Sequence, residues 1–187
     1  MAEVQARLAA WRREGLLMVD LRPRPEFARR AVAGATNVPA AELAGRYMEL
    51  PPRSVPFSLL VPPGEPRALP SRGPHAWQIT DAFEADEAFW AAAAHLGLAY
   101  SPAEDPREQP RLWQPCPLLE AHVGAIRQRL VSTFGAEQQP FRCWDVGCGV
   151  GRDAVFLAST GAFAVRGVDN RRAQLQRLQA LARRNGV

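Results

Sequence analysis

Hydrophobic and polar residues follow two different periods along this chain, and each period predicts a type of element. Apolar residues recur every three to four positions over 4–13, which predicts an amphipathic helix. Continuous apolar runs at 16–21, closed by Arg22-Pro23, and at 55–61, closed by Pro62-Pro63-Gly64, predict buried strands. Elsewhere in the first hundred residues we expect a helical turn at 25–30, a turn into a short strand at 34–39, a helix at 40–48, a loop at 62–74, a brief strand at 77–79 and a helix at 82–95.

Helices and strands alternate after residue 117, which is the order expected of an α/β fold. An amphipathic helix is predicted at 118–134, with one stripe formed by Leu119, His122, Val123, Ile126 and Leu130. It is followed by a strand at 141–146, a helix at 152–159, a strand at 162–168 and a helix at 171–185 with Leu175, Leu178 and Leu181 facing inward.

The segment from Tyr100 to Pro117 is the best candidate for a linker, because it combines five prolines with several charges. We therefore predict a first domain at 1–100, a linker at 101–117 and a second domain at 118–187.

Composition narrows the class of protein. The chain has 47% hydrophobic residues, without an apolar run long enough for a transmembrane helix or a secretory signal, so we expect a cytoplasmic protein with no membrane partner. The net charge of +4 comes from 23 arginines that are spread along the chain, and we predict no nucleic-acid partner. Cys116, Cys143 and Cys148 are odd in number, and with three distant histidines they predict neither disulfides nor a metal site.

A glycine-rich turn lies between the predicted strand at 141–146 and the next helix. Gly147, Gly149 and Gly151 permit positive φ and let a ligand approach the backbone, and the following helix offers free N–H groups at its start. The next strand ends at Asp169, 18 residues after Gly151, and a carboxylate there can accept hydrogen bonds from both hydroxyls of a ribose. Adjacent parallel strands bring the loop and the carboxylate to the same edge of the sheet.

The spacing of the glycines bears on the ligand. The order D-x-G-x-G-x-G differs from the G-x-G-x-x-G of dinucleotide binding, and Asp145 adds a carboxylate that would repel a pyrophosphate. The same carboxylate can receive an ammonium group directly or through water. These features favour a nucleoside that bears an amino acid; the alternative is a structural glycine turn in some other α/β protein.

Residues 145–153, Asp-Val-Gly-Cys-Gly-Val-Gly-Arg-Asp, resemble motif I of the class I S-adenosylmethionine-dependent methyltransferases. With the following Ala-Val-Phe-Leu-Ala, they are similar to the tellurite-resistance-type branch, which acts on small molecules. The resemblance implies S-adenosylmethionine as cofactor, a small-molecule methyl acceptor and a Rossmann-like βαβα unit. It implies that Gly147, Gly149 and Gly151 line the methionine part, that Asp169 holds the ribose, that Asn170 lies beside the adenine and that Cys148 is a small loop side chain rather than a nucleophile. We assign no catalytic residue.

The first hundred residues resemble a rhodanese domain. The resemblance rests on Val-Asp-Leu-Arg at 19–22, Glu-Phe at 26–27 and Gly-Ala-Thr-Asn-Val-Pro at 34–39, although Val-Ala replaces the usual His-Ile before the glycine. The family implies a catalytic cysteine after the strand at 57–61, where this chain has Pro-Pro-Gly-Glu. Sulfur transfer needs a thiolate, so we expect an inactive rhodanese-like module in which Asp20 and Arg22 form a structural turn pair rather than a catalytic pair.

Two hypotheses on function follow. The first is a methyltransferase whose domain is truncated behind the inactive module, because the methyltransferase family has seven strands and this chain supplies two; we then expect poor cofactor binding and no methylation by the chain alone. The second is a non-catalytic, rhodanese-like binding or regulatory protein, whose module contacts a protein partner.

Overall fold

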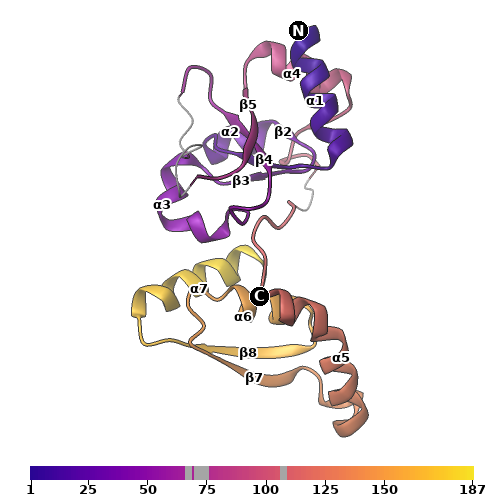
Figure 1. Ribbon diagram of the computed structural model, residues 1–187, viewed down its shortest axis with the longest axis vertical. Coiled ribbons are helices and arrows are strands. Elements are labelled where there is room, and N and C mark those ends of the chain that lie inside the picture. Colours follow the sequence, from indigo (N-terminus) through magenta and orange to yellow (C-terminus); the bar gives the residue numbers. More distant parts are fainter. Residues whose placement is uncertain (66–68, 70–75, 106–108) are drawn as a thin grey trace. The chain divides into compact units, whose positions relative to one another are not determined.

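The computed structural model describes residues 1–65, 69, 76–105 and 109–187 (Figure 1). The chain forms two compact units, Met1–Trp113 and Gln114–Val187, and each is described by itself. The fold is mixed α/β, with a parallel central sheet in the first unit and a parallel strand pair in the second. The division between the units falls inside the segment predicted as a linker.

The central sheet of the first unit has the strand order β3-β1-β4-β5, and all its pairs are parallel. Its strands are β1 (Leu17–Asp20), β3 (Ala35–Asn37), β4 (Phe57–Val61) and β5 (Ile79–Glu84). A small antiparallel pair, β2 (Ala31–Val32) with β6 (Ala99–Tyr100), was not predicted, because two-residue strands carry no periodic signal.

Both faces of this sheet are buried. Met18 of β1 belongs to one apolar cluster with residues of α1 (Ala2–Glu14) and α4 (Glu87–His95), whereas Val19 belongs to a second cluster on the other face. Figure 1 shows α1 and α4 side by side. All five residues of β4 are buried, which explains why this strand reads as a continuous apolar run in the sequence.

Two helix predictions in the first unit need correction. The helix predicted at 82–95 is wrong at its start, because residues 82–84 pair with β4 as part of β5. The helix begins after Asp86, whose side chain accepts a hydrogen bond from the N–H of Phe89 at 2.8 Å. The helix predicted at 40–48 is divided into three short pieces, which are η1 (Ala40–Glu42), α3 (Leu43–Arg46) and η2 (Tyr47–Glu49). The other helix of this region is α2 (Arg24–Arg29).

The last residues of the first unit lie against its core, although the sequence predicts them as linker. Leu112 and Trp113 are buried, and Leu112 packs in the second apolar cluster. The Thr36 hydroxyl donates to the carbonyl oxygen of Pro110 at 2.6 Å. Of the loop predicted at 62–74, residues 66–68 and 70–74 lie outside the described residues.

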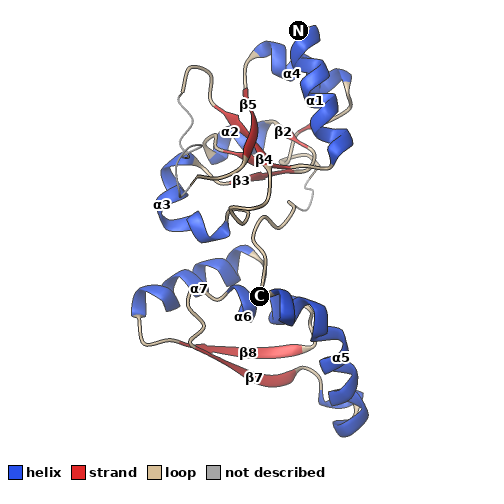
Figure 2. Cartoon of the chain, viewed as in Figure 1, coloured by secondary structure: helices blue, strands red, loops and turns tan. Residues whose placement is uncertain are grey.

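The second unit contains one pair of parallel strands, β7 (Phe141–Val146) and β8 (Phe163–Val168), which are in register along their whole length. Figure 2 shows α6 (Arg152–Ser159) and α7 (Arg172–Arg184) on the same side of this pair. The unit begins with α5 (Pro117–Phe134) and a single turn, η3 (Ala136–Gln138). The predicted apolar stripe of α5 is only partly covered, since His122 and Ile126 are exposed.

None of the helices in the described part of the chain combines the length and apolar character that a membrane span requires.

Candidate functional site

The glycine loop connects β7 to α6 at the carboxyl ends of both strands of the second unit. The N–H groups of Gly147 and Cys148 donate to the carbonyl oxygen of Val168 at 2.7 and 3.0 Å. These two hydrogen bonds fix the start of the loop to the end of β8. The loop and the predicted acidic residues at the strand ends therefore lie together at one edge of the strand pair.

The three glycines of the loop have positive φ, but they differ in what surrounds them. The φ angles are 77°, 55° and 84° at Gly147, Gly149 and Gly151. A Cβ at Gly147 or Gly149 would meet no atom within 4 Å, so these two positions face open space. A Cβ at Gly151 would lie 2.4 Å from Cγ of Leu178, so this glycine allows α7 to pack against the loop. Gly147 and Gly149 are the positions that a ligand can approach.

Asp169 directly follows β8, and its side chain is hydrogen-bonded to the glycine loop. Its Oδ2 accepts a hydrogen bond from the N–H of Gly149 at 2.9 Å, and its Oδ1 accepts one from Arg171 at 2.8 Å. These backbone donors lower the pKa of Asp169, so the carboxylate is charged at neutral pH. Asn170 follows it and is exposed.

Asp145 lies near the carboxyl end of β7 in a different environment. Burial, and secondly the negative charge of Asp153, raise the pKa of Asp145, while the N–H of Ala154 donates to its carboxylate. Its Oδ2 is buried and has no hydrogen-bond partner among the described residues. An unpaired buried oxygen is costly and therefore rare, and carboxylates with perturbed pKa values occur most often at functional sites. This atom can accept a hydrogen bond from a ligand.

Cys148 has the properties of a small loop side chain. Burial, followed by the charges of Asp145 and Asp169, raises the pKa of its thiol, so it is protonated at neutral pH and a weak nucleophile. Burial likewise raises the pKa of the Cys143 thiol on β7. Within the described residues, no group of three or more His, Cys, Asp or Glu side chains is arranged to hold a metal ion.

Two residues that the sequence analysis did not select also shape this site. A Cβ at Gly167 would lie 2.5 Å from Leu178 and 3.0 Å from the sulfur of Cys148, so this glycine lets the loop and α7 approach β8 closely. A glycine within a predicted strand is the signal that could have identified it. Asp153 accepts a hydrogen bond from the N–H of Cys116 at 2.6 Å and thereby ties the start of α5 to α6. No feature of the sequence pairs these two distant residues.

No protein-family model matches this chain. No curated protein matches it either. The assignment of a function therefore depends on the residues of the loop and their geometry.

Proposed function

We propose that the second unit is the S-adenosylmethionine-binding part of a class I methyltransferase that acts on a small molecule. The observation that carries this proposal is the loop itself, in which two open, positive-φ glycines lie between an unpaired buried carboxylate oxygen on Asp145 and the charged carboxylate of Asp169. The resemblance of residues 145–153 to motif I supports the same assignment.

Each group of the loop suits a different part of this cofactor. Asp145 Oδ2 can accept a hydrogen bond from the ammonium group of an amino acid, which would pair the unsatisfied oxygen and favour its charged form. Gly147 and Gly149 leave room for the methionine part of the cofactor to approach the loop backbone. Asp169 uses one lone pair on each oxygen for the loop, and each oxygen keeps another for a ribose hydroxyl.

The protein would position the reactants rather than supply acid–base chemistry. The cofactor, when bound, supplies a methyl group that its sulfonium already activates for transfer. Asp145 and Asp169 would orient the amino-acid and ribose parts of the ligand from two adjacent strands, and orientation of reactants can account for a large part of a rate enhancement. We assign no general base to the described residues of the loop.

The first unit, we propose, is a rhodanese-like module that does not transfer sulfur. The residues of the resemblance form one connected group: Arg22 donates to the carboxylate of Asp20, and the side-chain amide of Asn37 donates to the carbonyl oxygens of both residues at 3.0 and 2.9 Å. Asp20 is fully buried and Arg22 is 3% exposed, which supports a structural role for this pair. Its β4 strand leads into Pro62–Glu65 rather than a cysteine.

Calorimetric titration of the 187-residue protein with S-adenosylmethionine and with NAD⁺ tests the proposal for the second unit. We expect weak binding of S-adenosylmethionine, with a Kd above the micromolar range, because its sheet has two strands and one uncovered face. NAD⁺ should not bind, because Asp145 repels a pyrophosphate. Preference for NAD⁺ would overturn the assignment of the ligand, and micromolar affinity for S-adenosylmethionine would contradict the expected weakness.

Assay of thiosulfate-to-cyanide sulfur transfer tests the proposal for the first unit. The rate should equal the background without enzyme, since the segment after β4 supplies no thiol to form a persulfide. A clear rate that depends on the protein would show that another group carries the sulfur.

A further inference from the structure

The chain has three asparagines, Asn37, Asn170 and Asn185, and the structure gives each a different environment. An asparagine side chain can react with its own backbone, because the nitrogen of the next residue can attack Cγ and close a five-membered ring. The reaction needs an asparagine that can move, a following nitrogen that is not held by a strong hydrogen bond, and a following residue without a bulky side chain. These three conditions distinguish the asparagines of this chain.

Asn37 in the first unit meets none of these conditions. It is 7% exposed, and its side-chain amide donates to the carbonyl oxygens of Asp20 and Arg22 at 3.0 and 2.9 Å. The next residue is Val38, whose branched side chain hinders ring closure and whose N–H donates to the carbonyl oxygen of Asp20 at 2.9 Å. The amide of Asn37 is therefore protected by the fold.

Asn170, beside the glycine loop, meets only the first condition. It is exposed, but the next residue is Arg171, which has a long side chain. The N–H of Arg171 donates to Oδ1 of Asp169 at 2.8 Å, a short and charge-assisted hydrogen bond. The nitrogen that would attack Asn170 is therefore engaged.

Asn185 is followed by Gly186 at the end of α7, and this nitrogen is accessible. Gly186 has a φ of 69°, and a Cβ there would meet no atom within 4 Å. Its N–H donates to the carbonyl oxygen of Arg183 at 3.4 Å, which is long for a backbone hydrogen bond. Arg183 and Arg184 bring positive charge to this end of the helix, which favours loss of the amide proton.

The side chain of Asn185 is exposed and is held by a single turn of helix. Its amide donates to the carbonyl oxygen of Leu181 at 2.8 Å, within the last turn of α7. Terminal turns open locally at little cost in free energy, and this opening frees the side chain. Asn185 therefore meets all three conditions.

We propose that Asn185 is a site of deamidation. The nitrogen of Gly186 loses its proton and forms a bond to Cγ of Asn185, the bond from Cγ to Nδ2 breaks, and the amide group leaves with that proton as ammonia. Water then opens the five-membered imide at either carbonyl, which gives aspartate or isoaspartate at position 185. The reaction consumes only water and involves no oxidation or reduction. This inference does not depend on the proposed cofactor.

Deamidation should weaken the end of α7. A carboxylate at position 185 cannot donate to the carbonyl oxygen of Leu181, and its negative charge lies at the carboxyl end of a helix, where the helix dipole disfavours it. The same helix supplies the buried Leu181 to its unit and packs Leu178 beside Gly151 of the loop. The modified protein should therefore melt at a lower temperature.

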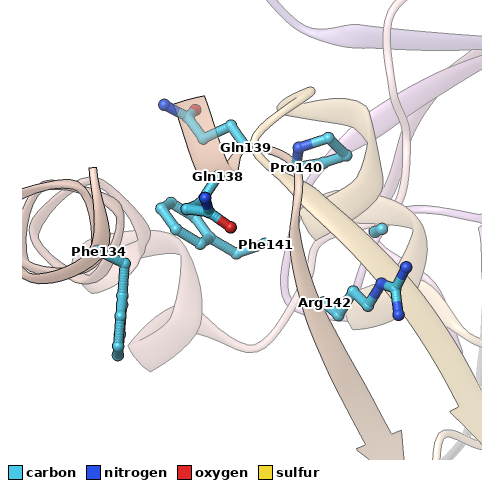
Figure 3. Close-up of a pocket in the computed structure, with 7 residues that line it drawn as sticks. Phe134, Gln138, Gln139, Pro140, Phe141 and Arg142 are labelled. Carbon is cyan, nitrogen blue, oxygen red and sulfur yellow. The ribbon is translucent and has the colours of Figure 1, made fainter. Parts of the chain in front are cut away.

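Two glutamines of the second unit serve as internal controls. Gln138 and Gln139 line a hollow of about 670 Å³ near the amino end of β7, and Figure 3 shows them beside Pro140. A glutamine would have to close a six-membered ring, which is slower, and Pro140 has no N–H with which to attack Gln139. Both amides should persist while Asn185 reacts.

Peptide mass spectrometry of the 187-residue protein, sampled during incubation at pH 7.4 and 37 °C, tests the proposal. The peptide with Asn185 should convert from amide to carboxyl at least ten times faster than the peptides with Asn37 and Asn170. Gly186→Ala should slow the conversion at least ten-fold. Gly161→Ala is the matched control, because it places a Cβ at a glycine with a φ of 70° and open surroundings just after α6, and it should leave the rate unchanged.

The products distinguish ring closure from direct hydrolysis. Cleavage by a protease that cuts before aspartate but not before isoaspartate should leave part of the product uncut. Aspartate alone would overturn the proposed route, as would an unchanged rate in Gly186→Ala. Conversion of Asn170 as fast as Asn185, or a stable Asn185, would overturn the site. Asn185→Asp should lower the Tm, and an unchanged Tm would contradict the expected effect on α7.

Discussion

Two aspartates at the ends of adjacent strands have opposite electrostatic environments, although both lie beside the same glycine loop. Asp169 receives two backbone hydrogen bonds that lower its pKa, whereas burial and Asp153 raise the pKa of Asp145. One carboxylate therefore stabilises the loop, and the other costs the folded protein free energy when it is charged. Carboxylates with perturbed pKa values occur most often at functional sites.

Neutralising these aspartates one at a time should shift the melting temperature in opposite directions. Asp145→Asn should raise the Tm at pH 7, because the pKa of Asp145 is higher in the folded than in the unfolded state, and the gain should shrink as the pH falls through that folded pKa. Asp169→Asn should lower the Tm at pH 7, because its depressed pKa means stability that is present above the unfolded pKa. Thermal melts from pH 7 to pH 4 measure both, and shifts of the same sign would contradict the assigned environments.

Glu42 in the first unit carries a second pH-dependent contribution to stability. It pairs with Arg24 at 2.7 Å and with Arg46 at 3.0 Å, and these hydrogen bonds lower its pKa from 4.5 to about 2. Because both ion pairs are partly exposed, Glu42→Gln should lower the free energy of unfolding by about 1 kcal/mol at pH 7. The difference from wild type should disappear between pH 4.5 and about pH 2. Urea unfolding at several pH values tests this, and a difference that stays constant across that range would argue against the ion pairs.

At the scale of elements, the contact between the loop and α7 depends on glycine. Gly151→Ala should destabilise the second unit by about 2–4 kcal/mol, because it adds positive-φ strain to a clash with Leu178. Gly147→Ala is the matched control, since its Cβ meets nothing, and it should cost about 1–2 kcal/mol from strain alone. Equal losses in denaturant unfolding would show that Leu178 does not determine the tolerance at position 151.

The elements that the sequence predicts correctly are those with a strong local signal. Apolar runs separated by glycines predict the parallel strands β7 and β8 and the helices α6 and α7. The predicted ends of these elements lie within two residues of the observed ends. The strand β5 was placed wrongly because Ala82 and Phe83 suit either a helix or a strand, and pairing with β4 decides between them. The hydrogen bond from Cys116 to Asp153 joins residues 37 positions apart, and no local pattern encodes such a contact.

For the molecule as a whole, the chain divides into two compact units, and each has buried apolar residues of its own, so we expect the units to unfold in separate transitions. Phe57→Ala removes a fully buried ring from the first unit and should cost about 3–5 kcal/mol there, without moving the transition of the second. Leu181→Ala should affect only the second unit, by about 2–5 kcal/mol. Differential scanning calorimetry of both variants provides the comparison, and a single transition that both substitutions shift would contradict independent units.

The measurement that tests the central claim most directly is a titration of the ¹⁵N-labelled 187-residue protein with S-adenosylmethionine, followed through its backbone amide signals. We expect saturable shifts of the amide signals of Gly147, Gly149, Asp169 and Asn170, with a Kd above the micromolar range, and no such shifts with NAD⁺. Asp145→Asn should weaken binding while the folded spectrum persists. Saturation without shifts in the loop, or the same shifts with NAD⁺, would contradict the claim that this loop binds S-adenosylmethionine.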